Sequence, residues 1–222
     1  MIARKPLLHL FFGLLLFCRG PALAEQANDA IGRKASEPYK GDLSIFENPK
    51  RDENLQINRV MDLLRIKRGS RVADIGAGSG WFTVRSARRV GKEGAVYAVE
   101  INRDYINHIK RRARQEKLLN IRTILGKPDD PLLPPAGMDA VLLLKTYHEI
   151  AEPIRLLRHV REAMRPGARL GIIDRRGKGS DHGLNADVVI KEAARAGFKL
   201  VEQYDFVKAD GMDYFLIFIS RE

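Results

Sequence analysis

Three glycines in alternating positions, Gly76, Gly78 and Gly80, follow a short apolar segment and precede an amphipathic one. Glycine lets the backbone approach a ligand closely and adopt torsion angles that side chains forbid. Asp74 lies two residues before the first glycine, and its carboxylate suits a cationic ligand better than a pyrophosphate, which it would repel. The dinucleotide-binding motif needs a third glycine where this chain has Trp81. The turn therefore predicts a site for a cationic small molecule rather than for a nicotinamide dinucleotide.

Tyr147, His148 and Glu149 form a second group of chemically versatile side chains, directly after a later apolar segment. Histidine changes charge near neutral pH, so His148 can take a proton from an acceptor, with Glu149 orienting it and Tyr147 lining the site. The simpler alternative is that His148 packs under the following helix and that Glu149 caps that helix. We take the three residues as candidate catalytic residues.

Arg175, Arg176 and His182 form a third group, which follows the next apolar segment. Arginine binds carboxylate and phosphate bidentately, so Arg175 and Arg176 are candidates for holding an anionic group of a substrate. A solvated basic loop is the alternative. His182 lies in a glycine-rich loop that is able to close over a site. Nothing in the spacing of His148, Asp174 and His182 requires a metal ion, and we expect none.

These groups need a scaffold that brings strand ends together. Apolar segments alternate with amphipathic ones, which predicts an α/β domain with an open, doubly wound, mostly parallel sheet and helices on both faces. The expected strands are residues 71–75, 95–99, 121–125, 140–144, 169–173, 198–204 and 214–219. The expected helices are residues 53–66, 80–90, 103–118, 152–164 and 184–196, and a proline-rich loop is expected at 129–135. Such sheets bind ligands at the carboxyl ends of their strands, where the three groups lie.

The segment Asp74-Ile75-Gly76-Ala77-Gly78-Ser79-Gly80 resembles the first motif of the class I S-adenosylmethionine-dependent methyltransferases. Later segments match that family in order. Glu100 matches the acid that binds both ribose hydroxyls, and one carboxylate does offer two acceptors to a vicinal diol. Asp129 matches the position that meets the adenine amino group, with Asp130 beside it leaving the register open.

The resemblance implies S-adenosylmethionine as cofactor, a seven-stranded sheet with an antiparallel last strand, and methyl transfer to a small or medium-sized acceptor that it does not name. The cofactor-binding residues that it implies are Asp74, Gly76, Ala77, Gly78, Gly80, Glu100, Ile101, Asp129 and Lys145. Asp74 as a cap for local amides and Glu100 as a solvated acid are the simpler alternatives. The alternative function is an exported, non-catalytic binding protein that retains the fold.

The first 24 residues have the pattern of an export signal. Arg4 and Lys5 precede an uncharged, apolar run, and Ala22-Leu23-Ala24 supplies the small residues that a signal peptidase reads. We expect a cleaved signal peptide at residues 1–24, a flexible leader at 25–44 and a methyltransferase domain at 45–222, periplasmic or secreted. An uncleaved signal with a cytoplasmic domain is the alternative. Cleavage would remove Cys18, the single cysteine, and with it thiol catalysis and cysteine-bound zinc.

The composition narrows the class of protein and of partner. Of the 222 residues, 45% are hydrophobic, which excludes an intrinsically disordered chain. The formal net charge of +11 favours anionic partners, but the sequence has no nucleic-acid-binding module, and we expect no nucleic acid. We expect no stable membrane span after signal cleavage. The expected partner is a small-molecule acceptor, with an anionic group favoured.

Overall fold

The computed structural model describes residues 33–221, so the predicted signal peptide and residues 25–32 of the predicted leader lie outside the described residues. The strands are β1 (Arg71–Ile75), β2 (Ala95–Glu100), β3 (Ile121–Leu125), β4 (Met138–Leu144), β5 (Met164–Arg175), β6 (Phe198–Tyr204) and β7 (Asp213–Ser220). The α-helices are α2 (Arg51–Leu55), α3 (Ile57–Leu63), α4 (Trp81–Val90), α5 (Arg103–Gln115), α6 (Pro153–Ala163) and α7 (Ala186–Arg195). Short 3-10 helices are η1 (Leu43–Phe46) and η2 (Tyr147–Glu149). No helix in this part of the chain is long and apolar enough to cross a membrane.

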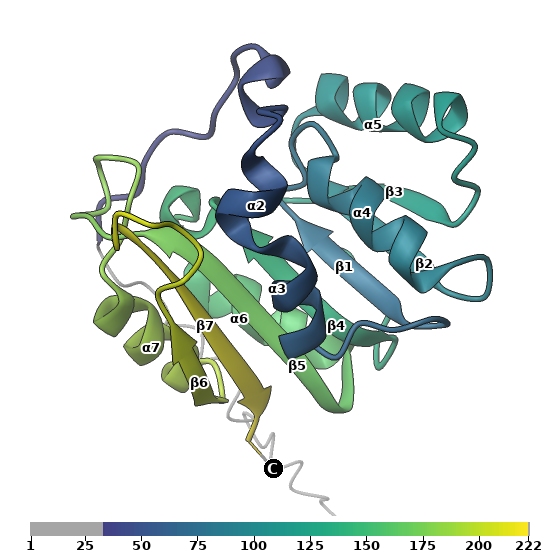
Figure 1. Cartoon of the computed structure of the whole chain (residues 1–222). Helices are drawn as coiled ribbons and strands as arrows, with labels where there is room; N and C mark the ends of the chain where they lie inside the picture. The colour runs from purple at the N-terminus through teal and green to yellow at the C-terminus, as the bar shows by residue number, and fades with distance from the viewer. Residues whose placement is uncertain (1–32, 222) are drawn as a thin grey trace, which may run out of the picture. The chain divides into compact units, whose positions relative to one another are not determined.

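Within residues 33–221, seven strands form one sheet in the order β3-β2-β1-β4-β5-β7-β6. Neighbouring strands are parallel except around β7, which runs antiparallel to both β5 and β6. Figure 1 shows the arrow of β7 pointing opposite to those of β1 and β5. The predicted fold class is confirmed: the sheet is doubly wound, seven-stranded and mostly parallel, with an antiparallel last strand.

Helices cover both faces of the sheet, because side chains that alternate along each strand point to both sides (Figure 1). On one face, α3 and α4 place Val60 and Phe82 in a core with Val72 of β1. On the other face, α6 and α7 place Leu157 and Val189 in the second core. Strand β4 is buried along almost its whole length between these layers, which accounts for its run of Val and Leu.

Two predicted elements differ from the structure. The helix predicted over residues 53–66 is divided into α2 and α3, because Gln56 between them has a left-handed backbone with φ of 45°. The two short helices preserve the apolar spacing that favoured one long helix. The strand predicted over residues 169–173 is longer, since β5 begins at Met164 directly after α6 and includes Pro166 and Gly167. Gly167 allows the bend there with φ of 77°.

Contacts with the domain start well before residue 45, where the sequence places the domain boundary. Ser36 is 6% exposed, and its N–H donates to the carbonyl oxygen of His148 at 3.0 Å. Arg33 donates from Nε to Glu192 Oε1 at 2.7 Å. This segment is purple in Figure 1 and passes above the ends of the strands. The part of the predicted leader that the structure describes is thus packed on the domain.

Candidate functional site

A cavity of about 720 Å³ lies at the carboxyl ends of β1, β2 and β4 and beneath residues 33–40. Its volume falls in the range of about 300–1,000 Å³ that is usual for small-molecule sites. The sheet order places β2 and β4 on opposite sides of β1, so the cavity occupies the point where open α/β sheets bind ligands. We call the part lined by residues 74–79 and 100–102 the glycine end, and the part lined by residues 35–40, 145–146 and 149–150 the Glu149 end. Gly80, which was predicted to bind the cofactor, is not on this wall.

The glycine turn is held against the neighbouring strand. The N–H groups of Gly76 and Ala77 both donate to the carbonyl oxygen of Val99, at 3.0 and 3.1 Å. Gly76 has φ of 72°, and a Cβ there would lie 2.3 Å from Thr146 Oγ1. Glycine is therefore required at this position both by the backbone angle and by the close approach of the segment that follows β4.

Glu100 ends β2 on the cavity wall and is only 8% exposed. Its Oε1 accepts hydrogen bonds from the N–H groups of Ile101 at 2.8 Å and Asn102 at 3.2 Å. Its Oε2 accepts one from the N–H of Gly78 at 3.0 Å. The backbone thus fixes the carboxylate, and Oε2, which accepts only one of these hydrogen bonds, keeps acceptor capacity for a ligand hydroxyl. Glu100 and the glycine turn, which the sequence predicted separately, belong to one hydrogen-bonded unit.

Asp74 and Arg51 place opposite charges on the cavity wall. Asp74 is 1% exposed and accepts a hydrogen bond from Thr83 Oγ1 at 2.6 Å. Burial raises the pKa of Asp74 to about 6, against the opposing effects of the Thr83 hydrogen bond and of Arg51. The Arg51 guanidinium lies 4.5 Å from the centre of the Trp81 ring, and burial lowers its pKa to about 10. Sequence reasoning missed Arg51, because no motif surrounds it.

At the other end of the cavity, Lys145, Thr146 and Glu149 contribute to the wall. Lys145 forms an ion pair with Asp213 of β7. Glu149 accepts a hydrogen bond from the N–H of Tyr39 at 3.2 Å, so the N-terminal segment closes over this end. Burial raises the pKa of Glu149 to about 7, partly offset by His148 and by the Tyr39 N–H.

Tyr147 and His148 do not belong to the cavity wall, although both were predicted as catalytic residues. Tyr147 is fully buried, and its hydroxyl donates to Glu192 Oε2 at 2.8 Å. Burial raises the pKa of this hydroxyl well above its usual value. His148 is 5% exposed, with Nδ1 2.8 Å from Asp174 Oδ1. The carboxylate that orients His148 is therefore Asp174 and not Glu149, whose Oε1 lies 3.9 Å from Nε2.

The remaining predicted residues lie farther from the cavity. Asp129 forms an ion pair with Arg155 at 3.0 Å, and among the described residues the wall there includes neighbours of Asp129 but not Asp129 itself. Arg175 and Arg176 are exposed and off the wall. The geometry gives no support to the prediction that these two arginines bind an anionic group of a substrate. His182 is exposed, but its ring centre lies 5.9 Å from that of His148.

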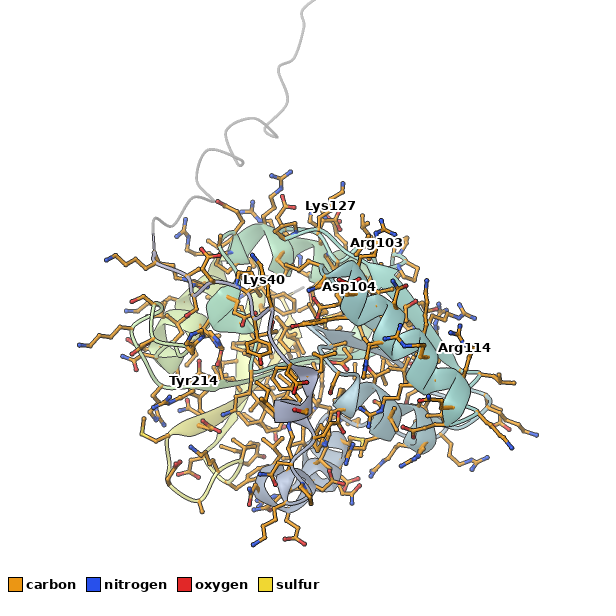
Figure 2. All side chains as sticks on the ribbon, turned by 90° about the horizontal axis from the view of Figure 1, so that it is seen from above. Lys40, Arg103, Asp104, Arg114, Lys127 and Tyr214 are labelled. Carbon is orange, nitrogen blue, oxygen red and sulfur yellow. The ribbon has the colours of Figure 1, made fainter. Side chains whose placement is uncertain are left out.

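Basic side chains border the cavity, seen from above in Figure 2. Lys40 from the N-terminal segment and Lys127 from the loop after β3 both contribute to its wall. Arg103 and Arg114 of α5 point outward into solvent, away from the buried side of that helix. The basic face of α5 is thus separate from the cavity.

The cavity wall has the features that S-adenosylmethionine requires. Glu100 offers a fixed carboxylate to a ribose diol, and the glycine turn brings its backbone to the cavity wall. Asp74 and Arg51 offer one anion and one cation to a zwitterionic amino-acid group. The residues present therefore fit this cofactor.

Known proteins resemble the same region of the chain. Residues 72–167 match a family model described as a methyltransferase domain. A protein-L-isoaspartate O-methyltransferase of Methanothrix thermoacetophila is 29% identical over 113 residues, which are 51% of this chain and 51% of that protein. A demethylmenaquinone methyltransferase of Listeria welshimeri is 23% identical over 115 residues, 52% of this chain and 49% of that protein. The chain spans about half the length of these curated relatives.

Among solved structures, a SAM-dependent methyltransferase from Aquifex aeolicus superposes with a TM-score of 0.72 at 22% identity. The match covers 81% of this chain and 98% of that one, and at this identity it shows a common fold. The family model adds the sequence signal, since residues 72–167 include the glycine turn, Glu100 and residues 145–149. Residues 72–167 thus carry a methyltransferase domain, and the chain has the fold of S-adenosylmethionine-dependent methyltransferases, which implies S-adenosylmethionine as the cofactor.

Proposed function

We propose that this protein transfers a methyl group from S-adenosylmethionine to a small acceptor bound at the Glu149 end of the cavity. The observation that carries the proposal is the carboxylate of Glu100, fixed by three backbone N–H groups on the wall of a cavity that continues to Glu149. A carboxylate held in this way is ready to bind a vicinal diol without reorganising. The two curated relatives are named for different acceptors, so their names do not identify the acceptor here.

Each group at the glycine end has a distinct task in this proposal. Glu100 binds the ribose hydroxyls, and the glycine turn allows the ligand to approach the backbone. Asp74 and Arg51 bind the ammonium and carboxylate of the methionine part. When bound, S-adenosylmethionine supplies a methyl group that a nucleophile on the acceptor can take. The protein chiefly positions the two reactants and excludes water.

At the Glu149 end, the protein can accept a proton from the acceptor. Glu149 contributes to the cavity wall, and burial raises its pKa to about 7. A group with a pKa near the working pH is suited to general base catalysis. Lys40 and Lys127 on the same wall favour an acceptor with an anionic group. His148 lies behind Glu149 and outside the cavity wall, and its hydrogen bond to Asp174 fixes the orientation of its ring.

We also propose that the domain is exported and that residues 1–24 are removed. The support is the sequence pattern alone, since these residues lie outside the described ones. Intact mass and N-terminal sequencing of the protein purified from the native host test this, and an N-terminus at Glu25 is expected. A chain that keeps Met1 and stays in the cytoplasmic fraction would contradict export. An exported enzyme also needs its cofactor delivered to the same compartment.

The first experiment is calorimetric titration of the full chain with S-adenosylmethionine and with its demethylated product. We expect one site with micromolar affinity for at least one of them. Glu100→Gln should weaken this binding strongly, whereas Glu93→Gln, on an exposed loop, should leave it unchanged. A well-folded sample that binds neither compound would instead favour a non-catalytic binding protein that retains the fold.

A further inference from the structure

Three side chains that can bind a metal ion meet beside the Glu149 end. His148, Glu149 and His182 each present one ligand atom, and these atoms lie within 4.8 Å of one another. His148 Nε2 and Glu149 Oε1 are 3.9 Å apart. The two imidazole rings are nearly perpendicular, at 88°, with their centres 5.9 Å apart. The fold thus brings two histidines from separate segments of the chain to one point.

Asp174 leaves the correct nitrogen of His148 available for a metal. This carboxylate is fully buried, and its Oδ1 accepts a hydrogen bond from Nδ1–H of His148 at 2.8 Å. Its Oδ2 accepts one from the backbone N–H of His148 at 2.9 Å. Because Nδ1 donates its proton to Asp174, the lone pair of the neutral ring is on Nε2, which faces Glu149. Metal-binding histidines commonly donate their second ring N–H to a carboxylate in this way.

Ser36 connects the two histidine segments. Its Oγ accepts a hydrogen bond from the N–H of His182 at 3.1 Å and donates to the carbonyl oxygen of Gly179 at 2.7 Å. Its own N–H donates to the carbonyl oxygen of His148 at 3.0 Å. The buried serine therefore holds the loop of His182 next to the segment of His148 and Glu149.

Two imidazoles and one carboxylate are a donor set typical of catalytic zinc sites. Magnesium and calcium prefer oxygen ligands only. Metal–ligand bonds of about 2.0–2.1 Å place tetrahedral ligand atoms about 3.3 Å apart, so the three groups need to close by up to about 1.5 Å. The side chain of His182 is exposed and can rotate to make that adjustment while Ser36 holds its backbone.

We propose that His148, Glu149 and His182 bind one zinc-type divalent ion, with Asp174 orienting His148. Three protein ligands leave a coordination position for water or for an oxygen or sulfur of a substrate. Because Glu149 also contributes to the cavity wall, that substrate would be the methyl acceptor, bound through an ionisable hydroxyl or thiol. This role rests on the proposed function, whereas the metal site itself does not. With the ion bound, the metal would lower the pKa of the acceptor in place of proton acceptance by Glu149.

The test is calorimetric titration of the untagged, chelator-treated full chain with Zn²⁺, checked by competition with a chromogenic chelator. One Zn²⁺ per chain is expected, with micromolar or tighter affinity, and His182→Ala and Glu149→Gln should each weaken it at least about tenfold. His182 carries the test because it is exposed, whereas the loss of buried His148 could disturb folding.

Two control variants separate this site from other zinc ligands. His159→Ala removes a histidine that lies outside the proposed metal site. Its Nδ1 is 3.5 Å from Glu162, so it is a histidine–carboxylate pair like that of His148 and Glu149 but is not part of the three-residue group. Cys18→Ser removes the single cysteine. Neither should change Zn²⁺ affinity. Absence of Zn²⁺ binding, or equal affinity in all these proteins, would overturn the metal site.

The same proteins are titrated with S-adenosylmethionine, so that the two proposals fail separately. His182→Ala should bind S-adenosylmethionine as the unchanged protein does. Loss of Zn²⁺ binding to every protein with cofactor binding intact would overturn the metal site alone. Zn²⁺ binding that depends on His182, in a chain that does not bind S-adenosylmethionine, would overturn the methyltransferase proposal alone.

Discussion

Different kinds of contact hold the residues of the glycine end and those of the Glu149 end in place. At the glycine end, backbone N–H groups fix Glu100, and they come from its own strand end and from the adjacent glycine turn. At the Glu149 end, side chains meet from segments far apart in the chain, with Tyr39 and Ser36 joining residues 148–149 and 179–182. The first arrangement follows from two neighbouring parallel strands, whereas the second exists only after the whole domain has closed. The glycine end is therefore suited to a cofactor shared by many relatives, and the Glu149 end to an acceptor that differs between them.

The largest expected effect is a difference in S-adenosylmethionine affinity between variants of two cavity carboxylates, Glu100 and Glu149. Glu100→Gln should weaken S-adenosylmethionine binding on the order of 100-fold, because two hydrogen bonds to a charged acceptor are each worth about 1.5–3 kcal/mol. Glu149→Gln should change that affinity much less, because Glu149 accepts its hydrogen bond from Tyr39 and makes none of those that join Glu100 to the glycine turn. Calorimetry on both variants measures the contrast.

Denaturant unfolding of both variants provides the control for this contrast. The amide introduced by Glu100→Gln would face backbone N–H groups, so this variant must be shown to be folded at the titration temperature. Equal losses of cofactor affinity in the two variants would remove the division of the cavity into two functional ends.

Asp74 should show that binding and stability oppose each other at the glycine end. Asp74→Asn removes a buried charge, and a pKa raised from 3.8 to about 6 corresponds to a destabilisation of about 3 kcal/mol when the carboxylate is ionised. The variant should therefore gain roughly 1–3 kcal/mol in unfolding free energy at pH 8, and lose about tenfold in affinity for the cationic cofactor. Urea unfolding and calorimetry measure the two quantities.

The pH dependence gives this prediction its sign. The folded state binds the proton of Asp74 more tightly than the unfolded state does. The free energy of unfolding of the unchanged protein therefore falls as pH rises from about 4 to about 6, and above that pH it loses no more through Asp74. Asparagine is neutral throughout. The stability gain of Asp74→Asn should thus be about half its full value at pH 5 and complete above about pH 7. A gain that shrinks with rising pH would show that the carboxylate is stabilising instead.

The contrast between the ends also explains what could be predicted from the sequence. The glycine turn and Glu100 lie at the ends of neighbouring strands whose apolar pattern is plain, so the pattern placed both at one edge of the sheet. The family resemblance supplied the role of Glu100. The pairing of His148 with Asp174 and His182 depends on the register of β4 against β5 and on Ser36, which lies over a hundred residues earlier. The sequence placed Tyr147 among candidate catalytic residues beside His148, and it gave no sign that the Tyr147 hydroxyl meets Glu192 of α7 inside the core.

A comparison of alanine variants at two glycines with similar backbone angles measures the energetic cost of the close contact between the two ends of the cavity. Gly76 has φ of 72° and lies against Thr146, whereas Gly69 has φ of 79° and a Cβ added there would have nothing within 4 Å. Gly69→Ala should cost about 1–2 kcal/mol from backbone strain alone. Gly76→Ala should cost about 2 kcal/mol more, because the methyl group must displace Thr146. Equal unfolding free energies for the two variants would mean that Thr146 moves away without cost.

Tyr147→Phe should give the smallest effect, and it decides whether this residue supports the Glu149 end or acts in it. The change removes one buried hydrogen bond, but Glu192 keeps its ion pair with Arg33, so the loss of unfolding free energy should be about 1 kcal/mol. Affinities for S-adenosylmethionine and for Zn²⁺ should stay unchanged, because the hydroxyl points into the core and away from the cavity wall. If either affinity falls while stability does not, Tyr147 contacts a ligand, and the Glu149 end extends deeper into the domain than residues 145–150.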